Sequence, residues 1–95
     1  MVTISALSTV YIKVHVEGAG GGEDVHMALV PPGTTPEQGD WQPAEWDTPT
    51  SRGCAARLLV GPAGHNVGAG TWDTWVKVEA DPEIPAFNSG QVNII

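Results

Sequence analysis

Strict alternation of apolar and other side chains over residues 9–17 constrains the fold of this chain more than any other feature. The apolar phase consists of Val10, Ile12, Val14 and Val16, and each of these residues is separated from the next by a single polar or aromatic residue. Successive side chains of a β-strand point to opposite faces, so a period of two predicts a strand with one face in a core.

The same period recurs later in the chain, between stretches rich in glycine and proline. We expect about seven short strands, at residues 2–7, 9–17, 25–30, 41–47, 53–60, 71–79 and 91–95. Pro43 interrupts the fourth of these segments, which suits an edge strand or a bulge. The prolines at 82 and 85 make residues 81–85 a stiff crossing between the last two strands.

These segments predict an all-β fold. No segment places apolar residues at helical spacing over two turns, so we expect essentially no helix. About seven antiparallel strands with frequent turns describe an immunoglobulin-like β-sandwich, with a small barrel as the competing closure. The 95 residues leave room for one core, so residues 1–95 are interpreted as a single domain.

The charge balance excludes two classes of partner. Four basic residues, scattered singly, face eleven acidic ones, which leaves no patch that could neutralise a row of phosphates or attract anionic lipid. We therefore expect no nucleic-acid and no membrane partner. The first seven residues lack the features of a signal peptide, and the single cysteine, Cys54, is interpreted as a buried strand residue.

The sequence contains no pattern that indicates catalysis. The glycine run at residues 18–22 does not match a phosphate-binding loop, and no serine lies in a nucleophile motif. His15 and His26 could approach each other if their strands pair, but we interpret both as surface residues, and His65 as a loop residue. We predict no enzyme activity, no cofactor and no metal site.

The four tryptophans are the strongest candidates for contacts, because aromatic side chains bury large areas and anchor interfaces. Trp72 and Trp46 are assigned to the core. Trp75 falls in the opposite phase to Trp72, so it either packs under residues 81–85 or meets a partner. Trp41 and Trp46 flank Pro43 in the interrupted strand, and a carbohydrate-binding platform is the rival use of this pair. Trp41 is also a candidate for a partner contact.

Residues 59–95 carry a recognisable series of motifs: LVGPAG, then GTWDTWVKV, DPEIP and GQVNI. They resemble a family of short virion-region proteins of phages of actinobacteria, whose usual form reads GTY-x-VWV-[KR]-V-x-D-x-PE-[IV]-PV followed by G-x-L-x-I. Residues 25–30 and the AEW at 44–46 fit the same family. The chain departs from the usual form at Trp72, Ala80 and Ala86.

The resemblance implies a virion structural protein that is assembled in the host cytoplasm. Capsid decoration or a minor capsid role comes first, with the major capsid protein or neighbouring virion proteins as partners in a symmetric multi-copy assembly. A head–tail connector or tail-associated protein is the alternative, and a carbohydrate-binding module for host attachment is the alternative of another class. The expected interface residues are Trp41, Trp75, Pro82, Glu83, Ile84 and Pro85.

Overall fold

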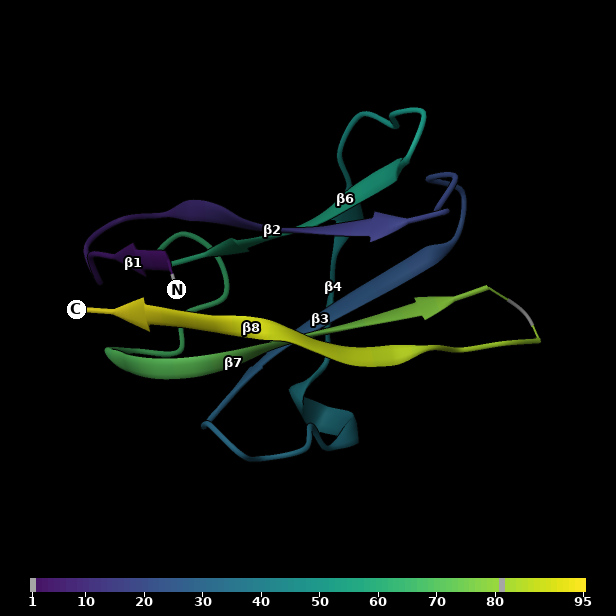
Figure 1. Ribbon diagram of the computed structural model, residues 1–95. Coiled ribbons are helices and arrows are strands. Elements are labelled where there is room, and N and C mark those ends of the chain that lie inside the picture. Colours follow the sequence, from purple (N-terminus) through teal and green to yellow (C-terminus); the bar gives the residue numbers. More distant parts are fainter. Residues whose placement is uncertain (1, 81) are drawn as a thin grey trace.

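The computed structural model of the protein describes residues 2–80 and 82–95 and is built almost entirely of β-strands (Figure 1). The strands are β1 (Val2–Ile4), β2 (Val10–Glu17), β3 (Asp24–Val30), β4 (Gln42–Pro43), β5 (Glu45–Trp46), β6 (Gly53–Val60), β7 (Gly70–Glu79) and β8 (Ala86–Ile94). A short 3-10 turn, η1 (Gln38–Asp40), precedes β4. The all-β prediction with essentially no helix is confirmed, and no described helix is long and apolar enough to cross a membrane.

The strands form two sheets. A five-stranded sheet has the order β1-β8-β7-β3-β4, and a three-stranded sheet has the order β2-β6-β5. We call them the large sheet and the small sheet. The prediction that all strands are antiparallel is wrong at one place, because β1 runs parallel to β8, with Val2 opposite Val92 and Ile4 opposite Ile94. β1 and β8 lie at opposite ends of the sequence, so no local turn signal could indicate that they pair.

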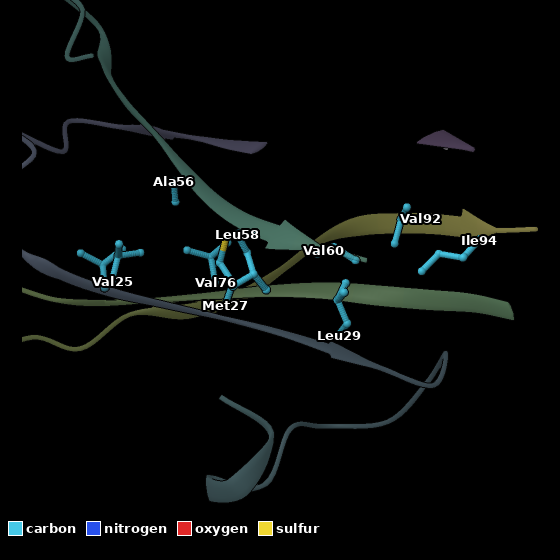
Figure 2. Packing of buried hydrophobic residues seen from close by; sticks show 10 residues of the cluster. Val25, Met27, Leu29, Ala56, Leu58, Val60, Val76, Val92 and Ile94 are labelled. Carbon is cyan, nitrogen blue, oxygen red and sulfur yellow. The ribbon is translucent and has the colours of Figure 1, made fainter. Parts of the chain in front are cut away.

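The core lies between the two sheets and follows the alternation of the sequence (Figure 2). Its fully buried members come from β3, β6, β7 and β8: Val25, Met27, Leu29, Ala56, Leu58, Val60, Val76, Val78, Val92 and Ile94. Trp46 and Trp72 pack against this cluster while partly buried. Their indole N–H groups donate to Glu23 O at 2.6 Å and Gly68 O at 3.2 Å, so each ring lies at the margin of the core.

The predicted single strand at residues 41–47 is two strands that belong to different sheets. Pro43 in β4 pairs with His26 of the large sheet, and Glu45 in β5 pairs with Arg57 of the small sheet. Ala44 connects them, and its N–H donates to Val25 O at 3.0 Å. Proline has no N–H for a second ladder, so the chain leaves the large sheet at Pro43 and turns into the other layer. Residues 2–80 and 82–95 thus form eight strands, one more than predicted.

Residues 82–85 close a hairpin within the large sheet, so the predicted crossing is wrong. β7 and β8 are antiparallel neighbours that pair from Gly70 opposite Ile94 to Lys77 opposite Ala86, with a bulge between Thr74 and Trp75. The last strand therefore begins at Ala86 and not at residue 91. Asp81, the first residue of the predicted crossing, lies outside the described residues.

Candidate contact surfaces

The six predicted interface residues fall on two parts of the molecule. Trp41 and Trp75 lie on the outer face of the large sheet and are half-buried. Pro82, Glu83, Ile84 and Pro85 are exposed at the end of the β7–β8 hairpin. The structure therefore brings the last four together and leaves the two tryptophans on a separate face.

The Trp41 ring is already occupied on one face. Lys77 Nζ lies 4.6 Å from the ring centroid, close enough for a cation–π interaction. Trp75 lies two residues before Lys77 in β7, and its Nε1 is buried without a hydrogen-bond partner in the described residues. A carbohydrate platform needs an open aromatic face for a sugar ring, so this arrangement does not favour that use of Trp41.

The end of the hairpin presents apolar side chains to solvent. Hydrogen bonds from Ala80 N–H to Glu83 O and from Val78 N–H to Pro85 O, both 3.0 Å long, hold the turn closed. Ile84 is 57% exposed and Phe87 is 36% exposed. Exposed aliphatic and aromatic groups on a stiff turn are suited to burial against a partner.

A second exposed apolar site lies at the opposite end of the molecule and was missed by the sequence analysis (Figure 1). Leu7 is 90% exposed and Ile95 is 69% exposed. Backbone hydrogen bonds join this region, from Ala6 N–H to Ile95 O at 2.7 Å and from Ile95 N–H to Ile4 O at 2.9 Å. Leu7 had been counted within the first strand, whereas that strand ends at Ile4, so its exposure could not be read from the pattern.

The outer face of the small sheet carries a network of charged groups that the sequence analysis also missed. Tyr11 Oη donates to Glu45 Oε1 at 3.0 Å, and Arg57 stacks over the Tyr11 ring at 4.4 Å from its centroid. Lys13 Nζ donates to Asp47 Oδ2 at 2.9 Å. The hydrogen bond from Lys13 and the backbone N–H of Thr48 lower the pKa of Asp47 below its usual value. These groups are paired across strands far apart in the sequence, so no spacing rule identifies them.

Asp73 is the buried charged residue of the large sheet, only 5% exposed. Its carboxylate accepts hydrogen bonds from Gly33 N–H at 3.0 Å, from Asn88 Nδ2 at 3.1 Å and from Gln91 Nε2 at 3.1 Å. These donors, the Gly33 N–H first, hold the pKa of Asp73 below its usual value. Asp73 fastens the loop after β3 to β8, which is a structural role.

The structure separates the histidines. β2 pairs with β6 in the small sheet, whereas β3 pairs with β7 and β4 in the large sheet, so the strands of His15 and His26 do not pair. His65 lines an open cleft of about 580 Å³ with Glu45 and Arg57, and partial burial lowers its pKa. Within residues 2–80 and 82–95, no group of three or more His, Cys, Asp or Glu side chains could hold a metal ion.

Comparison of the sequence with protein-family models and with curated proteins gives no match.

Proposed function

We propose that this chain is a structural protein of a tailed-phage particle, which binds the outer surface of the head shell as a decoration or minor capsid protein. The observation that carries the proposal is the exposed apolar turn of the β7–β8 hairpin, where Ile84 is 57% exposed. Residues 82–85 of this turn belong to the DPEIP motif, which is part of the series that resembles virion-region proteins of actinobacterial phages.

The two exposed ends fit a protein that is held between neighbours in a particle. Ile84 and Phe87 lie at one end, and Leu7 and Ile95 lie at the other. Each site is small, so one contact alone would be weak. Repeated symmetric contacts raise the overall avidity by orders of magnitude, which is how a small domain can stay bound to a shell. The net charge of −7 suits a place away from packaged DNA.

We also propose that the strands are connected as in an immunoglobulin fold. In immunoglobulin sandwiches, the third, sixth and seventh strands share one sheet, and the second, fifth and fourth share the other. The orders β8-β7-β3 and β2-β6-β5 agree with that scheme if β4 is counted as an addition to the first sheet. Domains of this kind display contact surfaces at their ends and on their faces.

The test is to measure the protein on purified particles and then to break the proposed contact. Quantitative mass spectrometry of particles is expected to find the chain in a fixed ratio to the major capsid protein. Ile84→Asp is expected to weaken binding of the purified protein to shells that lack it by at least about ten-fold, since a charge would replace an apolar anchor.

The matched control is Thr35→Asp, which places the same charge at an exposed loop position away from the hairpin. It is expected to bind like the parent protein. Absence of the chain from particles would contradict the proposal. If the chain were found only on tails, it would be a tail protein and not a head protein. Equal binding of the two variants would show that the hairpin is not the contact.

A further inference from the structure

The free edge of β2 offers a complete set of backbone groups for one more strand. β2 is the end strand of the small sheet, and among the described strands it pairs with β6 alone, from Val10 opposite Val60 to Glu17 opposite Gly53. Just beyond β2, Gly18 N–H donates to Arg52 O at 3.0 Å. Along an antiparallel edge strand, the backbone N–H and C=O groups of successive residues point alternately toward the neighbouring strand and away from it. In β2, the backbone groups of the even-numbered residues point toward β6. The odd-numbered residues therefore direct their N–H and C=O groups away from it.

These outward groups have no hydrogen-bond partner in the described part of the chain. They belong to Tyr11, Lys13, His15 and Glu17, all of which are exposed. Such an edge is normally blunted by a charged side chain. Two charged side chains lie on this edge, Glu17 at the last residue of β2 and Lys13 in its middle. The amino group of Lys13 is held by Asp47 at 2.9 Å, beyond β5 on the far side of the sheet, so the middle of the edge is not covered by it. The edge is thus open to pairing.

An apolar cleft runs beside this edge, because the large sheet extends further than the small one. One part of the cleft, about 250 Å³, lies between Ile12 and Val14 of β2 and Val92 of β8, with Val2 of β1 at its side. Polar side chains from both sheets line its rim: Lys13, His15, Thr74, Ser89 and Gln91. A second part, about 160 Å³, continues between Val16 and Phe87. The inward side chains of β2 are only half-buried, whereas those of β6 opposite the same sheet are buried. A strand placed beside β2 would cover them.

The shape of the cleft beside β2 favours binding of a single strand over binding of a second copy of the chain. A second copy that offered its own β2 would bring its own β8 and β1 beneath that strand. That layer is already filled, because β8 and β1 of the first copy form the floor of the cleft. A single extended segment carries no such layer and can pair with β2 through its backbone.

We propose that the β2 edge binds an extended segment of a partner protein by strand addition. Side chains at alternate positions of the segment enter the cleft beside Ile12 and Val14, so these positions are small and apolar. The net charge of −7 favours a neutral or basic segment over an acidic one. This surface adjoins the hairpin turn, because Pro85 and Phe87 line the second part of the cleft, but it does not depend on the location of the protein in a particle.

The test uses the full chain with a probe strand, Thr-Val-Thr-Val-Thr-Val-Thr, fused before Met1 through a Gly/Ser linker of about ten residues. Tethering gives the probe a millimolar effective concentration, so weak pairing becomes measurable. Amide hydrogen exchange at Lys13 and His15 is expected to slow by at least about ten-fold. The control probe replaces each valine by serine and is expected to give no protection.

The matched chain variants are His15→Pro and His15→Ala. Proline removes an outward N–H from the edge without touching the bonds to β6, so protection at Lys13 is expected to be lost. Alanine keeps the N–H and is expected to retain the protection. If His15→Pro does not fold, a probe with prolines in place of its threonines decides the question, because it lacks the donors that pairing needs.

Three outcomes would overturn the inference. Equal protection of the edge by the serine probe would show that the apolar cleft plays no part in binding. Protection that persists in folded His15→Pro, or with the proline probe, would show that no strand is paired with β2. A fused chain that sediments as a dimer in which β2 pairs with a second β2 would replace the partner segment by a second copy.

Discussion

β2 and β3 have the same alternation of apolar residues but very different burial. In β3, Met27 is 0% exposed, and even the outward residues Ala28 and Val30 are buried. In β2, the inward residues Ile12 and Val14 are only half-buried, although its pattern is the more regular of the two. β3 lies between β7 and β4 inside the large sheet, whereas β2 is an edge strand of the small one. Alternation therefore predicts which face of a strand turns inward, and the neighbours of the strand decide how deeply.

The largest expected effect is on the β3 side of this comparison. Met27→Ala removes a fully buried side chain and leaves a cavity between the sheets, so we expect it to lower the free energy of unfolding by about 2–5 kcal/mol. Val14→Ala removes a half-buried one and is expected to cost about 1 kcal/mol. Urea unfolding of both variants measures the difference. Equal losses of stability would mean that β2 is packed as completely as β3 in solution. The cleft beside β2 would then be filled in solution and not open to a partner.

The attachment of β2 to β6 gives the next effect. Gly53 has φ +147°, and a Cβ there would meet Val16 O and the backbone of β2. Gly53→Ala is therefore expected to destabilise the protein by about 1–3 kcal/mol, since both the backbone conformation and the close approach are disturbed.

Gly18→Ala is the control for that change, because Gly18 also has a positive φ, +79°, but has nothing within 4 Å of an added Cβ. We expect it to cost about 1 kcal/mol, from the backbone conformation alone. Thermal unfolding compares the two. An equal loss of stability in Gly18→Ala would show that the close approach of β6 to β2 at Gly53 does not contribute to the effect of Gly53→Ala.

The two sheets also differ in how a carboxylate is stabilised on or beside the outer face. Asp73 on the large sheet is buried and accepts hydrogen bonds from the uncharged donors of Gly33, Asn88 and Gln91. Asp47 beside the small sheet is more exposed and is paired with the cation of Lys13. The pKa of each carboxyl is lowered, but hydrogen bonding to neutral groups dominates at Asp73 and the lysine dominates at Asp47.

Asp73 should make stability depend on acid pH. Its pKa is lower in the folded protein than the usual 3.8, so its contribution is fully present above that value and is lost as pH falls through the folded pKa. Asp73→Asn is expected to lower the melting temperature at pH 7 and to flatten its decline below about pH 4. Melting curves across that range are the measurement. An unchanged decline in the variant would assign the acid sensitivity to other carboxyls.

The sequence predicted most of the core but not the boundaries of its sheets. The inward phases at residues 10–16, 25–29, 54–60 and 76–78 are correct, because burial of one face imposes the period of two. Residues 86–91 were missed as a strand, since they have no alternation and are all exposed. They are held in β8 by hairpin pairing with β7, for example Phe87 with Val76, and such pairing leaves no alternation in the sequence when the strand is exposed.

The contact surfaces were predicted less well, and for a physical reason. The exposure of Pro82 and Ile84 follows from a local signal, the proline-rich turn, and their contact with a partner stays a prediction. Leu7 was missed because its exposure depends on where β1 ends, and the charge network was missed because Lys13 and Asp47 are distant in sequence. Whether a tryptophan such as Trp41 is open or covered depended on Lys77, which reaches it across the sheet.

The smallest expected effect is that of Lys13→Met, which removes the cation from Asp47 while retaining a long apolar chain. The pair is exposed, and such pairs contribute little, so the melting temperature is expected to change by less than about 4 °C. The difference should disappear near 1 M salt, where the screening length is about 3 Å, whereas the effect of Asp73→Asn should persist.

The same variant has a sharper readout at Asp47 itself. Without Lys13, the pKa of Asp47 is expected to rise toward 3.8, because the hydrogen bond and charge that lower it most are gone. NMR titration of the carboxyl measures this shift. A pKa that stayed low would mean that the Thr48 N–H and Arg57 suffice to hold it. In that case the amino group of Lys13 would not be needed at Asp47, and it would be available to block strand pairing at the β2 edge. The fused probe strand would then pair with β2 more weakly than is expected for an open edge.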